Sequence, residues 1–562
     1  MNWVANTPPP ANAPNDDIQI DLPISKIGGA QTTLDIANLK TRSITFVNSS
    51  DNTNSSVRIS SATNSITFDN AGKFIGLDND KTHTIDVPVA LANTGPLEFK
   101  GTGSASGRVT ISKVVSGTPG IKLNHTGFGG GGALYLTGKN TFQGGVDLTS
   151  GLLGIGNDDA LGTGPLTING GAIASVNGKF APANPYTMNG GFLTVARGGT
   201  TDKLTLSGPG TFVGLHQITL DSPAEVLELS GAVTAPNAAL LRFNSKLATQ
   251  APTFRANPKK GESPIAETRA AAVISGKSPN FQASIEAYGV TLKVSDTLGA
   301  NGTEMNGVTF GDPTPAPPIG QPDPRVRTAV IARKGSFFVK NDRLLSVVGG
   351  KRTIWDQGDK IVTGSRTSAG TEVSVPGVTT IAGGGGFSME AETGFSMLMS
   401  GLSPGNDAGQ YSQLVMNDGG AVTLQHDVVN GTRPILYPVV AEDYTPNVGD
   451  QYKLIDQTAS FAPRLDASDN LFQIDPANAA ILSAGLPGDP TLYDGTVFQN
   501  GDGMVWRMRY GLTPGVDPGA TSSDMNDVYL QVVAVPEPFG LGAAGVVAAA
   551  GLLRRRRHRT RA

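Results

Sequence analysis

The stretch that decides the fold runs from residue 97 to residue 148, where short runs of alternating apolar and polar residues follow one another. They are Leu97-Glu98-Phe99, Val109-Thr110-Ile111, Ile121-Lys122-Leu123, Leu134-Tyr135-Leu136 and Val146-Asp147-Leu148. Their first residues are spaced by 12, 12, 13 and 12 positions. Alternation with a period of two predicts half-buried β-strands. The gaps hold Gly, Asn, Asp and Ser, which suit tight turns.

The same pattern extends over residues 40–235, and two architectures fit it. Sandwiches and barrels also place a strand every 8–12 residues or so. A parallel β-helix stacks its strands, and two strands at this spacing would make a rung of about 24 residues. The length of the series, its narrow spacing and an aromatic content of only 6% favour the β-helix. We therefore predict an all-β chain built on a right-handed parallel β-helix, or solenoid.

The composition excludes several other classes of protein. The 562 residues include 73 Gly and 37 Pro but no Gly-X-Y period, so the chain is not a collagen. It has no Cys, which excludes a disulfide scaffold and a thiolate metal site. The formal net charge of −4 offers no bulk attraction to nucleic acid. Only one long apolar run is present, at the C-terminal end, so a multi-span membrane protein is excluded.

Residues 134–175 carry a repeated turn pattern. Leu134-Tyr-Leu-Thr-Gly-Lys-Asn-Thr-Phe-Gln-Gly-Gly145 is followed by Val146-Asp-Leu-Thr-Ser-Gly151, then by Gly156-Asn-Asp-Asp-Ala-Leu-Gly162 and Leu166-Thr-Ile-Asn-Gly-Gly171. This order of strands and turns resembles the autotransporter-associated β-strand repeat, with Phe142 where Tyr is usual. The resemblance implies a β-helical region of a secreted or surface protein. The turn residues expected to shape its corners are Gly138, Asn140, Gly144, Gly145, Gly156, Asn157, Gly162, Gly170 and Gly171.

Composition shifts divide the rest of the chain. Residues 1–39 form an irregular N-terminal segment, and the β-helix spans 40–311, with a short helix expected near Ile265–Ala272. Residues 312–325 hold six prolines and form a linker or long loop. Strand patterns return over 326–534, as a β-rich continuation and a cap that Trp506 and Tyr510 help to close. Residues 535–562 form a separate tail.

The tail combines a motif, an apolar segment and a basic end. Val535-Pro536-Glu537-Pro538 precedes the apolar run 539–553, which is followed by Arg554, Arg555, Arg556 and Arg557. This arrangement resembles the PEP-CTERM sorting signal, which implies one C-terminal transmembrane helix and recognition by an exosortase-type processing enzyme. The run is about 22 Å long as a helix, shorter than a bilayer core of about 30 Å, so arginine snorkelling or local bilayer thinning is needed. The arginines would stop transfer and stay on the cytoplasmic side.

The charge of the tail contrasts with that of the body. Six basic residues lie in the last nine positions, which leaves 37 basic against 47 acidic residues in the body. A mildly acidic body rich in Gly, Ser, Thr and Asn suits a protein outside the cytoplasm, and no nucleic-acid partner is expected. The start, Met1-Asn-Trp-Val-Ala-Asn, has neither a basic region nor an apolar stretch of signal-peptide length. A start placed too late, a fragment and failed export would each explain this; we favour the first.

The search for catalytic and metal sites finds little. His83, His125, His216, His426 and His558 lie at least 40 residues apart, so no local zinc motif exists. Gly127–Gly132 matches a dinucleotide pattern but lies between strands. Gly276-Lys277-Ser278 lacks the first P-loop glycine, and in Gly401-Leu-Ser403-Pro-Gly405 the proline cannot donate to an oxyanion. We predict no cofactor, no metal and no catalytic residue.

The predicted function is structural. We expect an exported surface or matrix protein, adhesive or rod-like, that is anchored to the membrane in transit and binds exopolysaccharide through Asn, Thr and Ser ladders. The enzymatic alternative is a β-helical polysaccharide lyase or glycoside hydrolase, for which the candidate residues are Asp78, Asp80, Lys81, Asp158 and Asp159. In turns rich in Asn, Asp and Gly such carboxylates are more often turn formers. An autotransporter passenger is disfavoured because no run of amphipathic membrane strands is present.

Overall fold

The computed structural model describes most of the chain. The described residues are 17–21, 30–33, 39–47, 56–69, 71–92, 95–101, 107–126, 132–197, 202–221, 225–255, 260, 262–267, 269–314, 324–363, 371–458, 471–475, 480–483, 489–512 and 526–535. They are all-β, and their only helical elements are the short 3-10 turns η1 (Ala248–Gln250) and η2 (Gly350–Arg352). The tail predicted to hold the transmembrane helix and the stop arginines lies outside them.

The chain folds into two compact units that are interleaved in sequence. Unit 1 comprises Met1–Thr253, Glu267–Thr353 and Thr380–Phe387, and unit 2 comprises Phe254–Ala266, Ile354–Thr379 and Ser388–Ala562. Five strands contain the points at which the chain passes from one unit to the other: β28 (Thr253–Phe254), β29 (Ile265–Glu267), β38 (Thr353–Asp356), β41 (Val378–Ala382) and β42 (Gly386–Met389). The boundaries predicted from composition stay predictions, and residues 315–323 of the proline-rich segment lie outside the described residues.

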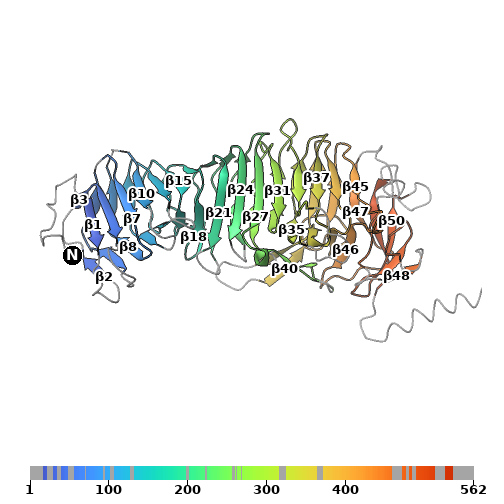
Figure 1. The fold of residues 1–562 in the computed structure, drawn as a ribbon. Coiled ribbons are helices and arrows are strands. Elements are labelled where there is room, and N and C mark those ends of the chain that lie inside the picture. Colours follow the sequence, from blue (N-terminus) through green and yellow to red (C-terminus); the bar gives the residue numbers. More distant parts are fainter. Residues whose placement is uncertain are drawn as a thin grey trace, which may run out of the picture. The chain divides into compact units, whose positions relative to one another are not determined.

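Long parallel sheets build unit 1 (Figure 1). Sheet A consists, in order, of β1 (Asp17–Asp21), β4 (Ser43–Val47), β7 (Phe74–Leu77), β10 (Leu97–Gly101), β13 (Ile121–His125), β15 (Val146–Ser150), β17 (Leu166–Ile168), β20 (Tyr186–Met188), β23 (Gly210–Phe212) and β26 (Val233–Thr234).

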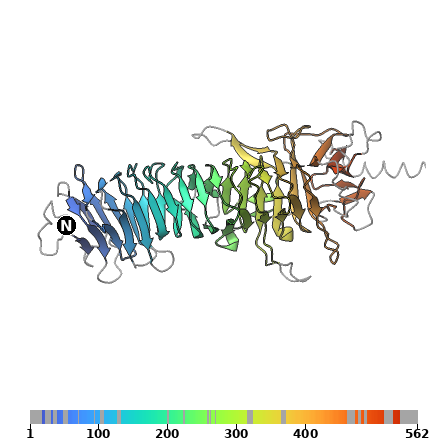
Figure 2. The ribbon, with the colours of Figure 1, turned by 90° about the horizontal axis from the view of Figure 1, so that it is seen from above.

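Sheet B of unit 1 holds the strands that follow those of sheet A in the chain and continues beyond them. They are β2 (Ala30–Thr33), β5 (Val57–Ser60), β8 (Thr82–Asp86), β11 (Arg108–Ile111), β14 (Ala133–Leu136), β16 (Leu152–Ile155), β18 (Ala172–Ser175), β21 (Gly191–Arg197), β24 (Leu215–Asp221), β27 (Leu240–Ser245), β31 (Ser284–Tyr288), β34 (Val308–Phe310) and β37 (Leu344–Val347). The two views show the strands of unit 1 standing side by side in rows (Figure 2).

Other strands make further sheets in unit 1. Sheet C contains β3 (Leu39–Thr41), β6 (Ile66–Phe68), β9 (Val89–Leu91) and β12 (Val115–Gly117). Sheet D of unit 1 contains β19 (Lys179–Phe180), β22 (Lys203–Leu206), β25 (Glu225–Leu229), β30 (Ala271–Ile274), β32 (Thr291–Val294) and β35 (Thr328–Ile331). A last pair is β33 (Thr297–Leu298) and β36 (Ser336–Phe338).

The register of sheet A explains why the 12-residue spacing predicted stacked strands. From β1 to β12 the chain visits sheets A, B and C in turn and then returns to sheet A. Leu97 pairs with Ile121, so one circuit is as long as the spacing predicted. Further along, Val146 pairs with Leu166 and Leu166 with Tyr186, so the circuits there are shorter. This arrangement is consistent with a β-helix.

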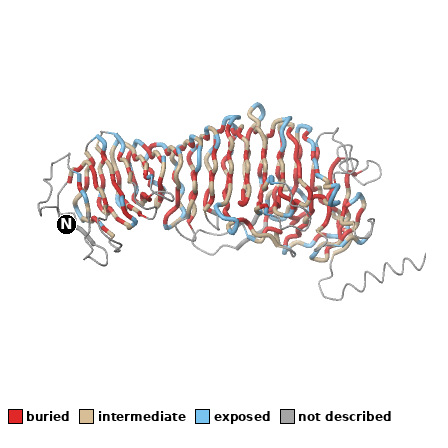
Figure 3. Tube along the Cα trace, viewed as in Figure 1, coloured by how far each residue is buried: buried red, intermediate tan, exposed pale blue. Residues whose placement is uncertain are grey.

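Stacked apolar columns form the core of unit 1. Inward residues of sheet A such as Leu97, Ile121, Val146, Leu166 and Tyr186 follow one another in register and are almost fully buried. Their neighbours along each strand face outward, so buried and more exposed positions alternate along the chain (Figure 3). Burying each such side chain contributes about 1.5–3 kcal/mol, so the columns are the main source of stability.

One local prediction was wrong. Residues 265–272 do not form a helix, because Ile265–Glu267 is strand β29 and Ala271–Ile274 is strand β30. Strand β30 lies between β25 and β32, and its residues are buried on both faces. Burial between two strands outweighs the helix preference of alanine, which amounts to less than about 1 kcal/mol per residue.

Unit 2 changes from parallel to antiparallel pairing. Parallel pairs join β43 (Gly394–Met399) to β46 (Ile435–Val440) and β44 (Gln413–Met416) to β47 (Gln451–Gln457). Beyond β47 the order is β51 (Val528–Ala534), β50 (Val505–Tyr510), β49 (Val497–Gln499) and β48 (Ala480–Ser483), all antiparallel. Unit 2 also holds β45 (Val422–Leu424) and the hairpin of β39 (Asp359–Thr363) with β40 (Thr371–Val375).

The aromatic residues expected near the end of the chain lie in this antiparallel part. Trp506 and Tyr510 are buried in β50, and the Tyr510 hydroxyl accepts the Phe472 N–H at 2.8 Å. The rings of Trp506 and Tyr452 lie 6.0 Å apart, edge to face. They contribute to the core of unit 2.

Candidate functional site

The glycines of the 134–175 pattern lie where neighbouring turns of the chain touch. A Cβ added to any of Gly138, Gly144, Gly145, Gly156, Gly162, Gly170 or Gly171 would come within 3.0 Å of atoms in an adjacent turn. Gly145 also has a φ of 74°, and the added Cβ would lie 2.1 Å from the Pro165 carbonyl oxygen. These positions need glycine for close backbone approach, which is a scaffold role.

Asn140 continues the strand ladder through a turn. Its side chain is buried; Oδ1 accepts the Val115 N–H at 2.7 Å and Nδ2 donates to the Ala160 carbonyl at 2.6 Å. The amide therefore replaces a peptide group between two neighbouring turns of the chain. Asn157 has a local role, since its Oδ1 accepts the Asp159 N–H at 3.0 Å.

Two carboxylates of the enzymatic alternative, those of Asp158 and Asp80, have contacts within unit 1. Asp158 accepts the Ala181 N–H at 2.7 Å, and Asp80 pairs with Lys81 at 2.8 Å. The Asp78 N–H donates to the Phe46 carbonyl at 3.1 Å. Among the residues that the structure describes, no group of three or more His, Asp or Glu side chains could hold a metal ion. These residues shape turns of unit 1.

The buried histidines lie inside unit 1. His83, His125 and His216 lie against Phe46, Phe99 and Phe212 respectively, with ring centroids 4.3–5.5 Å apart. His125 Nδ1 accepts the Gly132 N–H at 2.7 Å, so its Nε2 carries the proton and donates to the Leu77 carbonyl at 2.9 Å.

Burial changes the pKa of two of these histidines. Burial lowers the pKa of His83 from 6.5 to about 4 and also lowers the pKa of His216. His426 is partly buried in unit 2, and His558 lies outside the described residues. The buried histidines pack against phenylalanine rings, and His83 and His125 also form hydrogen bonds to neighbouring residues.

The outward face of sheet A carries a polar ladder, which is the best candidate for ligand binding. In register from β10 to β26 the outward residues are Glu98, Lys122, Asp147, Thr167, Thr187, Thr211 and Thr234. Beside it Asn169 donates to Asp147 at 2.7 Å and Asn189 donates to Asn169 at 2.9 Å. Neighbouring strands repeat every 4.8 Å or so, which gives a regular row of hydroxyl, amide and charged groups.

A shallow groove of about 470 Å³ lies over the first part of this ladder. Its polar lining includes Lys122, Asp147 and Thr167, and its walls include Pro96, Pro119 and Pro165. An open groove of hydroxyl, ammonium and carboxylate groups suits a flexible polyhydroxylated chain better than a small apolar molecule. The triplets at 121–123, 146–148 and 166–168 place these residues at equivalent middle positions, so the spacing contained this signal.

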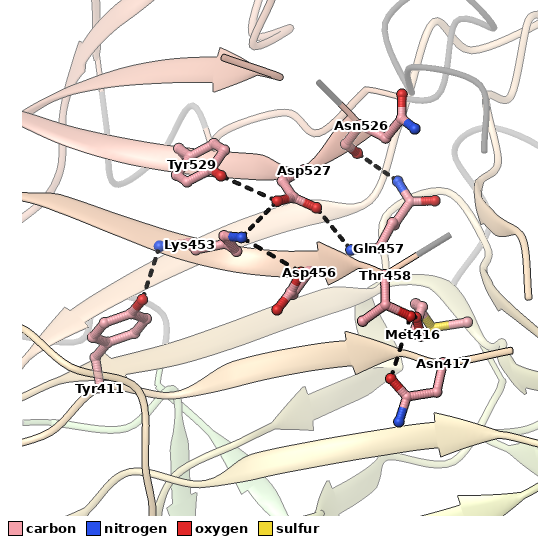
Figure 4. Close-up of polar contacts among 10 residues, drawn as sticks. All are labelled: Tyr411, Met416, Asn417, Lys453, Asp456, Gln457, Thr458, Asn526, Asp527 and Tyr529. Carbon is pink, nitrogen blue, oxygen red and sulfur yellow. Dashed lines mark hydrogen bonds and ion pairs between the residues drawn. The ribbon is translucent and has the colours of Figure 1, made fainter. Parts of the chain in front are cut away.

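A second polar cluster lies in unit 2 (Figure 4). Lys453 on β47 contacts Asp527, which directly precedes β51, and the Nζ to Oδ2 distance is 2.7 Å. Asp527 is 0% exposed. It also accepts the Gln457 N–H at 2.8 Å and the Tyr529 hydroxyl at 3.1 Å. Nothing in the sequence indicated this pair, because the antiparallel return of β51 brings it together.

The predicted sorting residues lie at the edge of the described chain. Val535 directly follows β51, whereas Pro536, Glu537, Pro538 and Arg554–Arg557 lie outside the described residues. Among the residues that the structure describes, no helix has both the length and the apolar character needed to cross a bilayer. No protein-family model, curated protein or solved structure matches the chain.

Proposed function

We propose that this chain is an exported, non-enzymatic β-solenoid protein of the bacterial cell surface or extracellular matrix. In this proposal the core of unit 1 is a right-handed parallel β-helix whose residues 134–175 belong to the autotransporter-associated repeat class. The right-handed sense is supported by the rule that parallel crossover connections are right-handed in about 98% of cases. Residues 535–562 serve as a PEP-CTERM signal that an exosortase-type enzyme processes.

The observation that carries the structural role is the outward ladder of sheet A with its groove. Hydroxyl and amide groups at regular intervals on a rigid sheet can hydrogen-bond successive sugars of an exopolysaccharide without further folding. Lys122 adds a site for an acidic sugar. The groove lining includes one carboxylate, Asp147, whereas glycoside hydrolysis usually needs a pair. This favours binding over the lyase or hydrolase alternative.

Binding can be tested with polysaccharide purified from the matrix of the cells that make this protein. Co-sedimentation of the purified chain should show binding that Lys122→Ala weakens by at least about tenfold, since a hydrogen bond to a charged group contributes roughly 1.5–3 kcal/mol. Lys139→Ala is the matched control, because Lys139 is exposed on a turn and does not line the groove. Equal binding by both variants would exclude the groove, and a fall in polymer length would favour the enzymatic alternative.

Processing needs a separate experiment. Expression from a start extended upstream, followed by cell fractionation and mass spectrometry of the mature C-terminus, should find surface protein that ends near Pro536. Replacing Pro536, Glu537 and Pro538 by alanine should leave the tail in place and the protein in the membrane fraction. A surface protein that keeps Arg554–Arg557 would contradict the sorting proposal.

A further inference from the structure

The Lys453–Asp527 cluster has the parts of a self-modifying site. The Lys453 amine is 2.7 Å from Asp527 Oδ2, so nucleophile and carboxyl carbon are held next to each other. Lys453 lies on β47, opposite Tyr529 of β51 in the antiparallel register, and Asp527 directly precedes β51. Strand β47 thus fixes Lys453, and Asp527 is held by the strand that it directly precedes. Because the two groups are already held together, their reaction avoids the loss of entropy that a reaction between separate molecules would carry.

The carboxyl group of Asp527 is held on both oxygens. The Gln457 backbone N–H donates to Oδ1 at 2.8 Å, and the Tyr529 hydroxyl donates to Oδ2 at 3.1 Å (Figure 4). A fixed N–H at Oδ1 is placed to stabilise negative charge on that oxygen when a nucleophile adds to the carbon. The hydroxyl at Oδ2 is placed to support the departure of this second oxygen.

A third group can move the protons. Asp456 Oδ1 lies 3.5 Å from Lys453 Nζ and belongs to the same strand. A carboxylate at this distance can take a proton from the attacking nitrogen and deliver it to the leaving oxygen after a small side-chain movement. The amine, the carboxylic acid and the proton carrier therefore all lie within one cluster.

We propose that Lys453 and Asp527 form an intramolecular isopeptide bond between Nζ and Cγ. The pair first becomes neutral when a proton passes from Nζ to Oδ2 along their hydrogen bond. The nitrogen lone pair then adds to Cγ, the Nζ–Cγ bond forms, and the bond from Cγ to the former Oδ2 breaks. Asp456 carries one proton from nitrogen to that oxygen, which leaves as water. No oxidant or other reactant is needed.

The environment favours the neutral pair from which the reaction starts. Burial raises the pKa of Asp527, while the hydrogen bond from Lys453 acts in the opposite direction. Keeping an ion pair in a region of low dielectric costs desolvation energy that an uncharged amide does not carry. The bond would also join two segments, β47 and the start of β51, that lie far apart in the sequence. In a chain without Cys this is a covalent constraint that no disulfide supplies.

Mass spectrometry of the purified full chain tests the bond directly. The wild-type mass should be lower than the calculated mass by one water. Digestion with trypsin should yield one branched peptide that joins the segments around Lys453 and Asp527. A wild-type chain that keeps its full calculated mass after incubation at growth temperature, and that trypsin cuts after Lys453, would overturn the proposal.

Variants distinguish a loss of the reaction from a loss of the folded structure. Lys453→Arg keeps a positive charge but should show its full calculated mass. Asp527→Asn should react with loss of ammonia in place of water and so reach the same final mass as the wild type. Asp456→Asn should slow the reaction severalfold, because the proton carrier is lost. A water loss that persists in Lys453→Arg would place the modification elsewhere and refute this assignment.

Discussion

At the scale of single residues, Gly145 shows how closely successive turns approach one another. Gly145→Ala should lower the free energy of unfolding by about 3 kcal/mol, since positive φ costs roughly 1–2 kcal/mol and crowding a packed site about as much again. Gly72 is the matched control, because its φ is 73° but nothing lies within 4 Å of an added Cβ. Urea denaturation should give a loss of only about 1 kcal/mol for Gly72→Ala. Equal losses would show that the contact with Pro165 is unimportant.

Asn140 offers a second test at this scale. Asn140→Ala leaves the Val115 N–H and the Ala160 carbonyl without this partner, and each such loss costs about 1–3 kcal/mol, so we expect a total of about 2–6 kcal/mol. Asn157→Ala removes one exposed turn hydrogen bond and should cost about 0.5–1 kcal/mol. Urea unfolding of both variants measures the difference. A larger loss for Asn157→Ala would contradict the role assigned to Asn140.

His83 makes stability depend on pH. Its pKa is about 4 in the folded chain and 6.5 when exposed, so between these values the unfolded chain binds a proton that the folded chain does not. The free energy of unfolding therefore has its full value, as far as His83 is concerned, above pH 6.5. It falls as the pH drops toward 4, by roughly 3 kcal/mol in total. Thermal unfolding across this window should show a shallower slope in His83→Gln. Some slope should remain, because burial also lowers the pKa of His216. An unchanged slope would contradict this account.

At the scale of elements, protection from hydrogen exchange should depend on the number of neighbouring strands. β15 is hydrogen-bonded to β13 and β17, whereas β1, within the described residues, pairs with β4 alone. In stacked arrays each turn is stabilised by its neighbours, so opening is easiest at an end. Native-state exchange followed by mass spectrometry should find amides of Val146–Ser150 exchanging at least tenfold more slowly than those of Asp17–Asp21. Equal rates would argue against this model.

The strands of sheets A and B were predictable because their signal is local. Leu166-Thr167-Ile168 places apolar residues inward and threonine outward, and the same alternation in the next turn fixes the register. Sheet C was not predicted as a separate layer, because its strands, such as Val89–Leu91 and Ile66–Phe68, show the same alternation of buried and more exposed positions as the strands of sheets A and B. The helix expected near residue 265 failed for a related reason: buried alanines fit a central strand as well as a helix.

The functional residues also differ in how well the sequence predicts their position. Lys122, Asp147 and Thr167 occupy equivalent positions in successive strand motifs, so their common face could be read from spacing alone. Lys453 and Asp527 are brought together by an antiparallel return late in the chain, and no local pattern encodes that return. The glycines of the 134–175 pattern were recognised as turn residues, but the contacts that require them depend on the neighbouring turn.

At the scale of the whole molecule, two compact units imply more than one unfolding transition. A chain of 562 residues that folds into two compact units is not expected to unfold in a two-state manner. In calorimetry, Asn140→Ala should shift a transition of unit 1, and Lys453→Arg should shift a different transition, of unit 2, with each leaving the other within a degree or so. One cooperative transition that both variants shift equally would contradict this independence.

The pairing of Val146 with Leu166 has a consequence for how such a chain can change over generations. A tandem copy of residues 146–165 would bring a second Val146 into the place that Leu166 now fills, with its inward and outward residues already in phase. The copied strand would pair with the original Val146–Ser150 strand on one side and with Leu166–Ile168 on the other. The length of this protein can therefore grow by gene duplication in steps of one turn, without new packing having to be invented.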